Sequence, residues 1–269
     1  MEIMIENCHY HVETIGNGDP LLLLHGFTGN VGTWKEGIAY LKGEYRCITV
    51  DIIGHGKSSC PAEAERYNIE LVARDLKELM NQLGYSRFHV LGYSMGGRLA
   101  LTLAVLFPEA VQSLLLESAS PGLKTTNERL RRKESDEALA QKIEREGIRA
   151  FVDYWESIPL FATQNKLPLK KQEMVRQQRL QNSIVGLSSS LRGMGTGSQP
   201  SWWEQLPSLS MPVLLLTGTE DKKFTKIAYE MSQLFPSVVW KEINGTGHAI
   251  HVEDCEKFGT IIKEFLSHT

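Results

Sequence analysis

No apolar run in this chain approaches the roughly 20 residues that a membrane span requires. The first residues, Met-Glu-Ile-Met-Ile-Glu, lack the basic and apolar regions of a secretory signal peptide. Cys8, Cys47, Cys60 and Cys255 are scattered and form no Cys-x-x-Cys pair, which argues against a zinc site and against a disulfide framework. We therefore expect a cytoplasmic protein with no membrane partner and no bound metal.

The chain also lacks a strong charge of either sign, since its formal net charge is −3 at pH 7. A nucleic-acid partner is not expected, because proteins that bind nucleic acids present concentrated basic surfaces. Hydrophobic residues make up 42% of the chain and charged residues 23%, proportions typical of a globular protein. A chain of 269 residues forms one large domain or two small ones.

Short apolar runs alternate with helical patterns along most of the sequence, and an irregular β-hairpin is predicted at residues 3–14. The apolar runs are almost continuously hydrophobic, as expected for parallel strands that are buried on both faces. The predicted strands are residues 21–24, 47–51, 88–91, 114–117, 213–217 and 238–243. Helical patterns such as residues 69–83 lie between them. This order predicts an α/β fold with a mostly parallel, doubly wound sheet.

The alternation breaks between about residues 121 and 207, where no convincing strand is found. The helical patterns there are residues 127–146, 147–157, 168–182 and 184–194. We therefore predict that residues 1–120 and 208–269 form the sheet domain and that residues 121–207 form an inserted helical lid.

The predicted lid differs in charge from the rest of the chain. Residues 124–192 contain 14 Lys and Arg and nine Asp and Glu, a balance of +5, whereas the whole chain is −3. Most of these charges individually are better explained as solvated helix faces. Taken together, a positive lid over a cleft favours an anionic ligand.

The most informative feature is the pentapeptide Gly-Tyr-Ser-Met-Gly at residues 92–96. It follows a predicted strand and precedes the helical pattern 97–107, which Pro108 ends. Gly-x-Ser-x-Gly in that setting predicts a nucleophile elbow, a turn so sharp that glycine is needed on both flanks. Ser94 is therefore the predicted catalytic hydroxyl.

A serine hydroxyl needs a histidine to take its proton, and the histidine needs a carboxylate to fix its tautomer. His248, in Gly-Thr-Gly-His after the last predicted strand, is the predicted histidine. Asp221, just after the strand at 213–217, is the predicted acid, because its carboxylate would emerge at the same sheet edge as Ser94. Glu220 and Glu117 are the alternatives for the acid.

Two backbone N–H groups complete the predicted machinery. The N–H of Phe27, just after the strand at 21–24, would pair with that of Met95 to form an oxyanion hole. His25 is expected to brace this loop and His55 to shape a turn, while His251 is expected to pack or to face solvent.

Together these motifs resemble the α/β-hydrolase fold superfamily across essentially the whole chain. The matching segments are residues 25–27, 51–58, 92–97, 218–221 and 247–248. The resemblance implies an α/β-hydrolase core and a Ser-His-Asp triad. It implies little about the reaction, because one fold hosts many chemistries.

A second set of motifs is similar to a narrower family, the 2-succinyl-6-hydroxy-2,4-cyclohexadiene-1-carboxylate (SHCHC) synthases of menaquinone biosynthesis. These motifs are residues 92–98, 117–123, 128–132, 151–155, 161–162, 191–197 and 221–224. The lid segments among them count most, because ordinary esterases vary freely there. The resemblance implies a lyase that eliminates pyruvate from 2-succinyl-5-enolpyruvyl-6-hydroxy-3-cyclohexene-1-carboxylate without adding water.

The same resemblance implies a small substrate with several carboxylates and no cofactor or metal. Arg98, Arg132 and Arg179 would hold the carboxylates, since guanidinium groups suit bidentate carboxylate binding. Arg98 has a structural alternative, because it opens a helix that packs on the sheet, and Arg132 is one of three neighbouring arginines. The further pocket residues that the resemblance implies are Tyr93, Trp155 and Lys223.

In the implied mechanism Ser94 acts as a base activated by His248, and it is not acylated. The main alternative is a serine carboxylesterase or C–C bond hydrolase that acts on a small anionic substrate. A non-enzymatic binding protein is disfavoured, because such proteins usually lose a triad member and here all three positions are filled. We expect a monomer or a weak homo-oligomer.

Overall fold

The computed structural model describes residues 1–269 and is built on one eight-stranded sheet, in the order β1-β2-β4-β3-β5-β6-β7-β8. The strands are β1 (Glu2–Ile5), β2 (Cys8–Ile15), β3 (Asp19–Leu24), β4 (Tyr45–Val50), β5 (Phe88–Tyr93), β6 (Val111–Glu117), β7 (Val213–Gly218) and β8 (Val238–Ile243). β1 and β2 form the predicted hairpin, and β2 pairs antiparallel with β4, whereas all other pairs are parallel. The predicted α/β fold with a mostly parallel sheet is confirmed.

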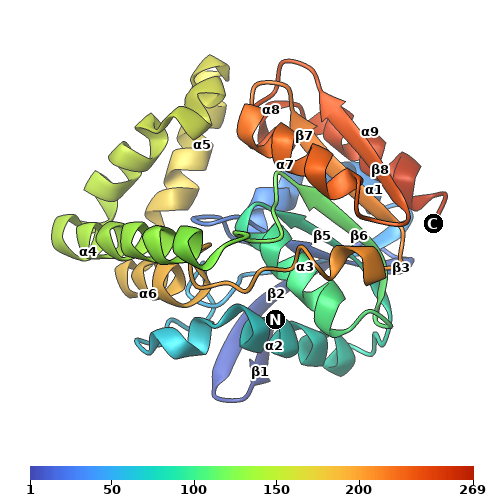
Figure 1. Ribbon diagram of the computed structural model, residues 1–269, viewed down its shortest axis with the longest axis horizontal. Coiled ribbons are helices and arrows are strands. Elements are labelled where there is room, and N and C mark those ends of the chain that lie inside the picture. The colour runs from blue at the N-terminus through green and yellow to red at the C-terminus, as the bar shows by residue number, and fades with distance from the viewer.

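Helices cover both faces of this sheet (Figure 1). The core helices are α1 (Lys35–Leu41), α2 (Ile69–Gln82), α3 (Met95–Leu106), α7 (Lys222–Ser232), α8 (Ile250–Glu253) and α9 (Cys255–Leu266). Short 3₁₀ helices η1 (Val31–Trp34), η2 (Ala64–Tyr67) and η4 (Leu206–Ser208) join them. None of the helices is both long and apolar enough to cross a membrane.

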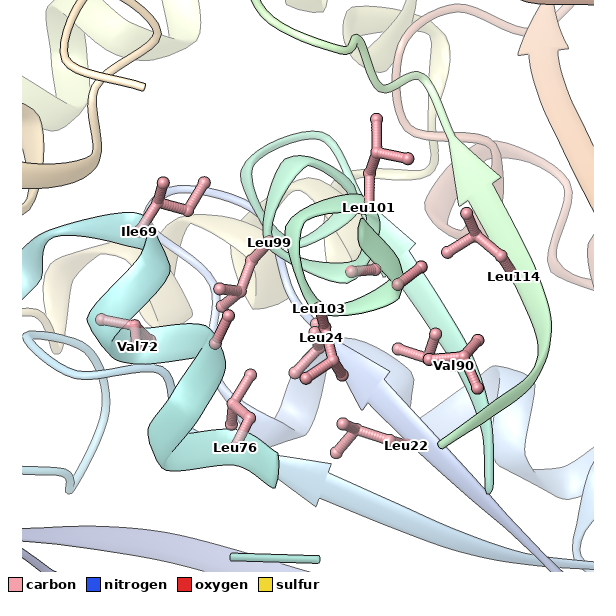
Figure 2. Close-up of a cluster of buried hydrophobic side chains, with 14 of the residues drawn as sticks. Leu22, Leu24, Ile69, Val72, Leu76, Val90, Leu99, Leu101, Leu103 and Leu114 are labelled. Carbon is pink, nitrogen blue, oxygen red and sulfur yellow. The ribbon is translucent and has the colours of Figure 1, made fainter. Parts of the chain in front are cut away.

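The continuous apolar runs are explained by packing on both faces of the sheet. On β3, Leu22 and Leu24 belong to the apolar cluster formed with α2 and α3, where Leu76 and Leu99 meet them (Figure 2). The alternate residues of β3, including Leu23, belong to a second cluster on the opposite face, formed with α1 and α9. Side chains alternate across a strand, so a strand buried on both faces has no polar position.

β8 departs from the prediction of burial on both faces. It is the edge strand and pairs only with β7. Its residues are mostly half-buried or exposed, and Val239 has 41% of its surface exposed. The apolar run at 238–240 predicted the strand correctly. The predicted burial on both faces was wrong, because β8 has a neighbouring strand on one side only.

Between β6 and η4 the chain inserts three α-helices and one 3₁₀ helix, with no strand among them. They are α4 (Thr126–Ser157), η3 (Pro159–Lys166), α5 (Leu169–Leu180) and α6 (Ile184–Met194). Gly147, with φ 81° and ψ 170°, breaks α4 at the boundary that the sequence predicted between two helices. We propose that residues 121–207, called the lid segment below, form a lid on the sheet core.

The lid segment has a small apolar cluster of its own and lies to one side of the sheet core in Figure 1. The cluster consists of Ala140, Ile143, Phe151, Val152, Leu187 and Leu191. One tryptophan of the lid segment, Trp202, bonds to the core helix α3, and the neighbouring Trp203 bonds within the lid segment. Trp202 Nε1 donates to Thr102 Oγ1 at 2.9 Å, and Trp203 Nε1 donates to the Gly122 carbonyl at 2.9 Å.

Candidate active site

Ser94 lies on the turn between β5 and α3, at the C-terminal edge of the sheet. Its φ of 51° and ψ of −105° are strained for a residue with a side chain, as expected at a nucleophile elbow. A Cβ added at Gly92 would lie 2.3 Å from the Gly96 carbonyl oxygen, and one added at Gly96 would lie 2.1 Å from the Leu24 carbonyl oxygen. The turn therefore requires glycine on both sides of Ser94.

The structure brings together the three predicted triad residues from distant parts of the chain. His248 Nε2 lies 3.0 Å from Ser94 Oγ, and His248 Nδ1 lies 2.6 Å from Asp221 Oδ2. Asp221 caps α7 and is 7% exposed, while His248 is 1% exposed. With Nδ1–H donating to the carboxylate, Nε2 is left to accept the serine proton.

The alternative acids do not reach His248. Glu220 is exposed. Glu117, at the end of β6, is fully buried and accepts from His251 through Nδ1 at 2.8 Å and through its backbone N–H at 3.0 Å. The sequence analysis missed this second histidine–carboxylate pair. The sequence did contain a signal for this pair, because Glu117 ends a predicted buried strand and His251 follows His248 by one helical turn.

His25 braces the loop after β3, as predicted. Its Nδ1–H donates to the Gly26 carbonyl at 2.8 Å, and its Nε2 accepts from the Ile52 N–H at 3.0 Å. His55 Nδ1 donates to the Ile53 carbonyl at 3.2 Å. Burial lowers the pKa of His25 to about 4 and the pKa of His55 to about 3, so both rings are neutral supports at neutral pH.

The two predicted oxyanion donors are free to bind a ligand. The backbone N–H groups of Phe27 and Met95 have no acceptor in the protein. Met95 is the first residue of α3, where helical N–H groups are unpaired and the helix dipole favours negative charge. Both residues line the same cavity as Ser94 and His248. An anionic oxygen beside Ser94 would therefore meet unpaired donors.

This cavity has a volume of about 500 Å³, within the range of small-molecule sites. The sheet core supplies one wall, and the lid segment supplies the other through α4, η3 and α6. Five of the six predicted substrate-binding residues line it, namely Tyr93, Arg98, Arg132, Trp155 and Lys223. The indole Nε1 of Trp155 is buried and has no hydrogen-bond acceptor in the protein.

The positive charges of the cavity differ in how they are compensated. Arg98 is buried and donates through Nη1 only to neutral acceptors, and burial lowers its pKa to about 10, so it remains charged at neutral pH. Arg132 donates through Nε to Asp136 at 2.7 Å. Lys223 forms no ion pair, and burial together with the nearby Arg132 lowers its pKa. Arg98 and Lys223 therefore bring to the cavity positive charge that no ion pair compensates.

Arg179, the sixth predicted residue, does not line this cavity. Its guanidinium is buried against Glu156 Oε1 at 3.1 Å and Gln164 Oε1 at 3.0 Å, and it lies 4.9 Å from the ring centroid of Phe161. Phe161 itself lines the cavity. The role of Arg179 in substrate binding stays a prediction. No cluster of three or more His, Cys, Asp or Glu side chains is arranged to hold a metal ion.

Comparison with known proteins places this chain in a family. The profile of the alpha/beta hydrolase fold matches residues 19–254. The chain belongs to the α/β-hydrolase fold family. It is 42% identical, over 93% of its length and 90% of the relative's, to a Bacillus subtilis protein provisionally named as SHCHC synthase. An SHCHC synthase of Serratia proteamaculans is 26% identical, over 91% of this chain and 92% of the relative.

Two solved structures are similar over nearly the whole chain. MenH from S. aureus has a TM-score of 0.91 and 37% identity, covering 96% of this chain and 98% of that one. A malate-bound thermophilic esterase from Thermogutta terrifontis has a TM-score of 0.87 and 28% identity, covering 97% and 94% of the two chains. The same architecture is thus found with proteins named for different reactions.

The close approach at Gly96 gives a prediction for stability. Replacement of Gly96 by alanine should force the elbow away from the Leu24 carbonyl, at a cost of about 1–3 kcal/mol or more in the free energy of unfolding. Thermal unfolding measures the effect. Gly43→Ala is the control, because a Cβ there would meet no atom within 4 Å. Equal melting temperatures for the two variants would contradict the steric argument.

The acid assignment can be tested by labelling Ser94 with a fluorophosphonate. Asp221→Asn should slow labelling on the order of 10³–10⁴-fold, because the amide no longer holds His248 in the tautomer that accepts the serine proton. Glu117→Gln is the control and should stay within about tenfold of the natural protein, as its partner is His251. The reverse pattern would reassign the acid to Glu117.

Proposed function

We propose that the protein is an SHCHC synthase, a carbon–oxygen lyase of menaquinone biosynthesis. It would eliminate pyruvate from 2-succinyl-5-enolpyruvyl-6-hydroxy-3-cyclohexene-1-carboxylate to give SHCHC. The observation that carries the proposal is an intact triad that opens into a cavity with uncompensated positive charge. The 42% identity with the Bacillus subtilis relative, over 93% of the chain, supports the same reaction.

The chemistry follows from the order of the contacts. His248, held by Asp221, accepts the Ser94 proton, and Ser94 removes the ring proton α to the succinyl carbonyl. The C–H electrons form a ring double bond, the existing double bond shifts by one position, and the C–O bond to the enolpyruvyl group breaks. The leaving enolate takes up a proton and becomes pyruvate. No water is consumed, so the reaction is an elimination.

The developing charge in this step lies on the succinyl carbonyl oxygen. The unpaired N–H groups of Phe27 and Met95 are the donors available beside Ser94 to stabilise it. Arg98, Arg132 and Lys223 would bind the substrate carboxylates, with Tyr93 and Trp155 forming apolar walls for the ring. Binding by remote carboxylates positions the ring for proton transfer, which is a large part of the catalytic task.

We also propose that the protein works in the cytoplasm as a monomer or a weak homo-oligomer. All the groups of the site come from one chain, so catalysis does not require a second subunit. The substrate would be a small multi-carboxylate molecule, with no role for nucleic acid, membrane, metal or cofactor. The triad and the two backbone donors suffice for proton abstraction and charge stabilisation.

Pyruvate release from the chemoenzymatically prepared substrate tests the proposal. Ser94→Ala should lower kcat on the order of 10²–10⁴-fold, the usual contribution of a general base. Mass spectrometry of the natural protein during turnover should show no acylated Ser94. An acyl-enzyme with this substrate would instead assign Ser94 as a nucleophile.

A carboxylesterase is the second candidate, because the triad is complete and one similar structure is named as an esterase. Turnover of p-nitrophenyl acetate with no release of pyruvate would select this alternative. The charge of the cavity argues against it, since a neutral ester gains nothing from buried guanidinium groups.

The carboxylate-binding role of Arg132 gives a separate prediction. Arg132→Ala should raise KM roughly 10- to 100-fold and change kcat by less than about threefold, because a charged hydrogen bond common to ground and transition states is lost. Arg131→Ala is the matched control, because Arg131 is exposed and does not line the cavity. An unchanged KM for Arg132→Ala would show that another residue binds the carboxylate.

A further inference from the structure

We propose that Gln199 is a positioning residue that determines specificity for anions. It holds the Arg98 guanidinium on a neutral acceptor, so that the positive charge of Arg98 stays available to a substrate carboxylate. The inference rests on the proposed function only in that the substrate is anionic. Gln199 does not line the cavity and would not touch the substrate.

The contacts of Arg98 are the first observation. Its Nη1 donates to the Met194 carbonyl at 2.8 Å and to Gln199 Oε1 at 2.7 Å. Both acceptors are neutral, and no carboxylate forms an ion pair with Arg98. The remaining N–H groups of Arg98 have no acceptor in the protein, and the side chain lines the cavity beside Ser94. Arg98 thus has no carboxylate at hydrogen-bond distance, and the nearby Asp136 is already paired with Arg132.

Several arginines of the lid segment, in contrast to Arg98, form ion pairs with carboxylates. Arg132 pairs with Asp136, Arg179 with Glu156, and Arg192 with Glu137 and Glu144. Arg176 pairs with Asp153 and Glu156. Each of these guanidinium groups has a carboxylate at hydrogen-bond distance. Arg98 is more deeply buried than Arg132 and has none, which makes its free charge a specific feature of the cavity.

Gln199 carries a cost that a glutamate would avoid. The residue is fully buried, and its Nε2 has no hydrogen-bond acceptor. A buried donor left unpaired is unfavourable. A carboxylate of the same shape would have no such donor and would form an ion pair with Arg98. The amide therefore leaves one buried donor unpaired, and it leaves the guanidinium of Arg98 without an ion pair.

The position of Gln199 is set by the glycine-rich turn that follows α6. The backbone N–H of Gln199 donates to the Gly195 carbonyl at 3.2 Å, and the N–H of Gly197 donates to Asp136 Oδ2 at 3.3 Å. Asp136 is the partner of Arg132. This turn thus supports both arginines of the cavity, one through a neutral amide and one through a carboxylate. Support of the two arginines is therefore a role for the motif at residues 191–197, which the fold alone does not explain.

The experiment compares two nearly isosteric replacements, using pyruvate release and thermal unfolding. Gln199→Glu keeps the hydrogen bond and adds a charge, so KM should rise at least about tenfold while kcat changes less than about threefold and the melting temperature stays equal or rises. Gln199→Met removes the acceptor without adding charge, so its KM should rise less than that of Gln199→Glu.

A purely structural role predicts the opposite ranking. Gln199→Glu would then leave KM unchanged, because shape and hydrogen bond are kept, and Gln199→Met would be the damaging change. Gln141→Glu is the matched control for added charge, since Gln141 lies on the exposed side of α4 in the same lid segment. In an Arg98→Met background, Gln199→Glu should not raise KM further, and a further tenfold rise would overturn the proposal.

A second readout separates this inference from the proposed function. Tricarballylate, a small tricarboxylate, should protect Ser94 from fluorophosphonate labelling, and Gln199→Glu should weaken that protection at least about tenfold. This result would support the role of Gln199 even if no pyruvate is released from the cyclohexene substrate. Equal protection of the natural protein and Gln199→Glu, or none in either, would overturn it.

Discussion

The close approach of α3 to the sheet at the Ser94 turn is the constraint on which the rest of the site depends. Gly92 and Gly96 let the backbones of β5, α3 and β3 come within distances that no Cβ would tolerate. The turn holds Ser94 in strained φ and ψ values and leaves the Met95 N–H unpaired at the start of α3. A single packing arrangement therefore fixes both the hydroxyl and one donor of the proposed oxyanion hole.

In the proposed function the lid segment would add selectivity to the triad and backbone donors of the sheet core. The sheet core supplies the triad, the two backbone donors and Arg98, while the lid segment supplies Arg132, Trp155 and the turn that holds Gln199. Most lid arginines are neutralised by neighbouring carboxylates, so the excess of basic residues in the sequence overstates the charge that a ligand meets. The charge that matters is the small part left without a carboxylate partner.

The sequence was sufficient wherever function depends on local chain geometry. The glycines around Ser94 and the positions of Asp221 and His248 after strands predicted contacts that the structure contains. Resemblance to a family predicted five side chains that line the cavity. The predicted burial of β8 on both faces was wrong, because β8 is an edge strand. The order of the strands in the sheet determines which strand lies at the edge, and sequence periodicity does not encode that order.

Outside the triad, several pairings between distant residues were not predicted. Arg179 belongs to the predicted set, but Glu156 and Gln164 hold it behind Phe161, and no motif encodes that competition. Glu117 and His251 are 134 positions apart, and Gln199 lies 101 positions from Arg98. Tertiary packing determines these partners. The sequence therefore indicated the charged residues but not the side chains that pair with them.

We infer that the choice between hydrolysis and elimination on this scaffold would depend on substrate position more than on the triad. An ester carbonyl placed over the Phe27 and Met95 donors would expose its carbon to Ser94, and acylation would follow. A substrate held by its carboxylates at Arg98 and Arg132 can instead present a C–H bond to the same hydroxyl. The His248 contact serves either outcome, because in both cases it accepts the Ser94 proton. Replacement of Arg98 or Arg132 should thus lower the rate of elimination more than the rate of attack on a small neutral ester.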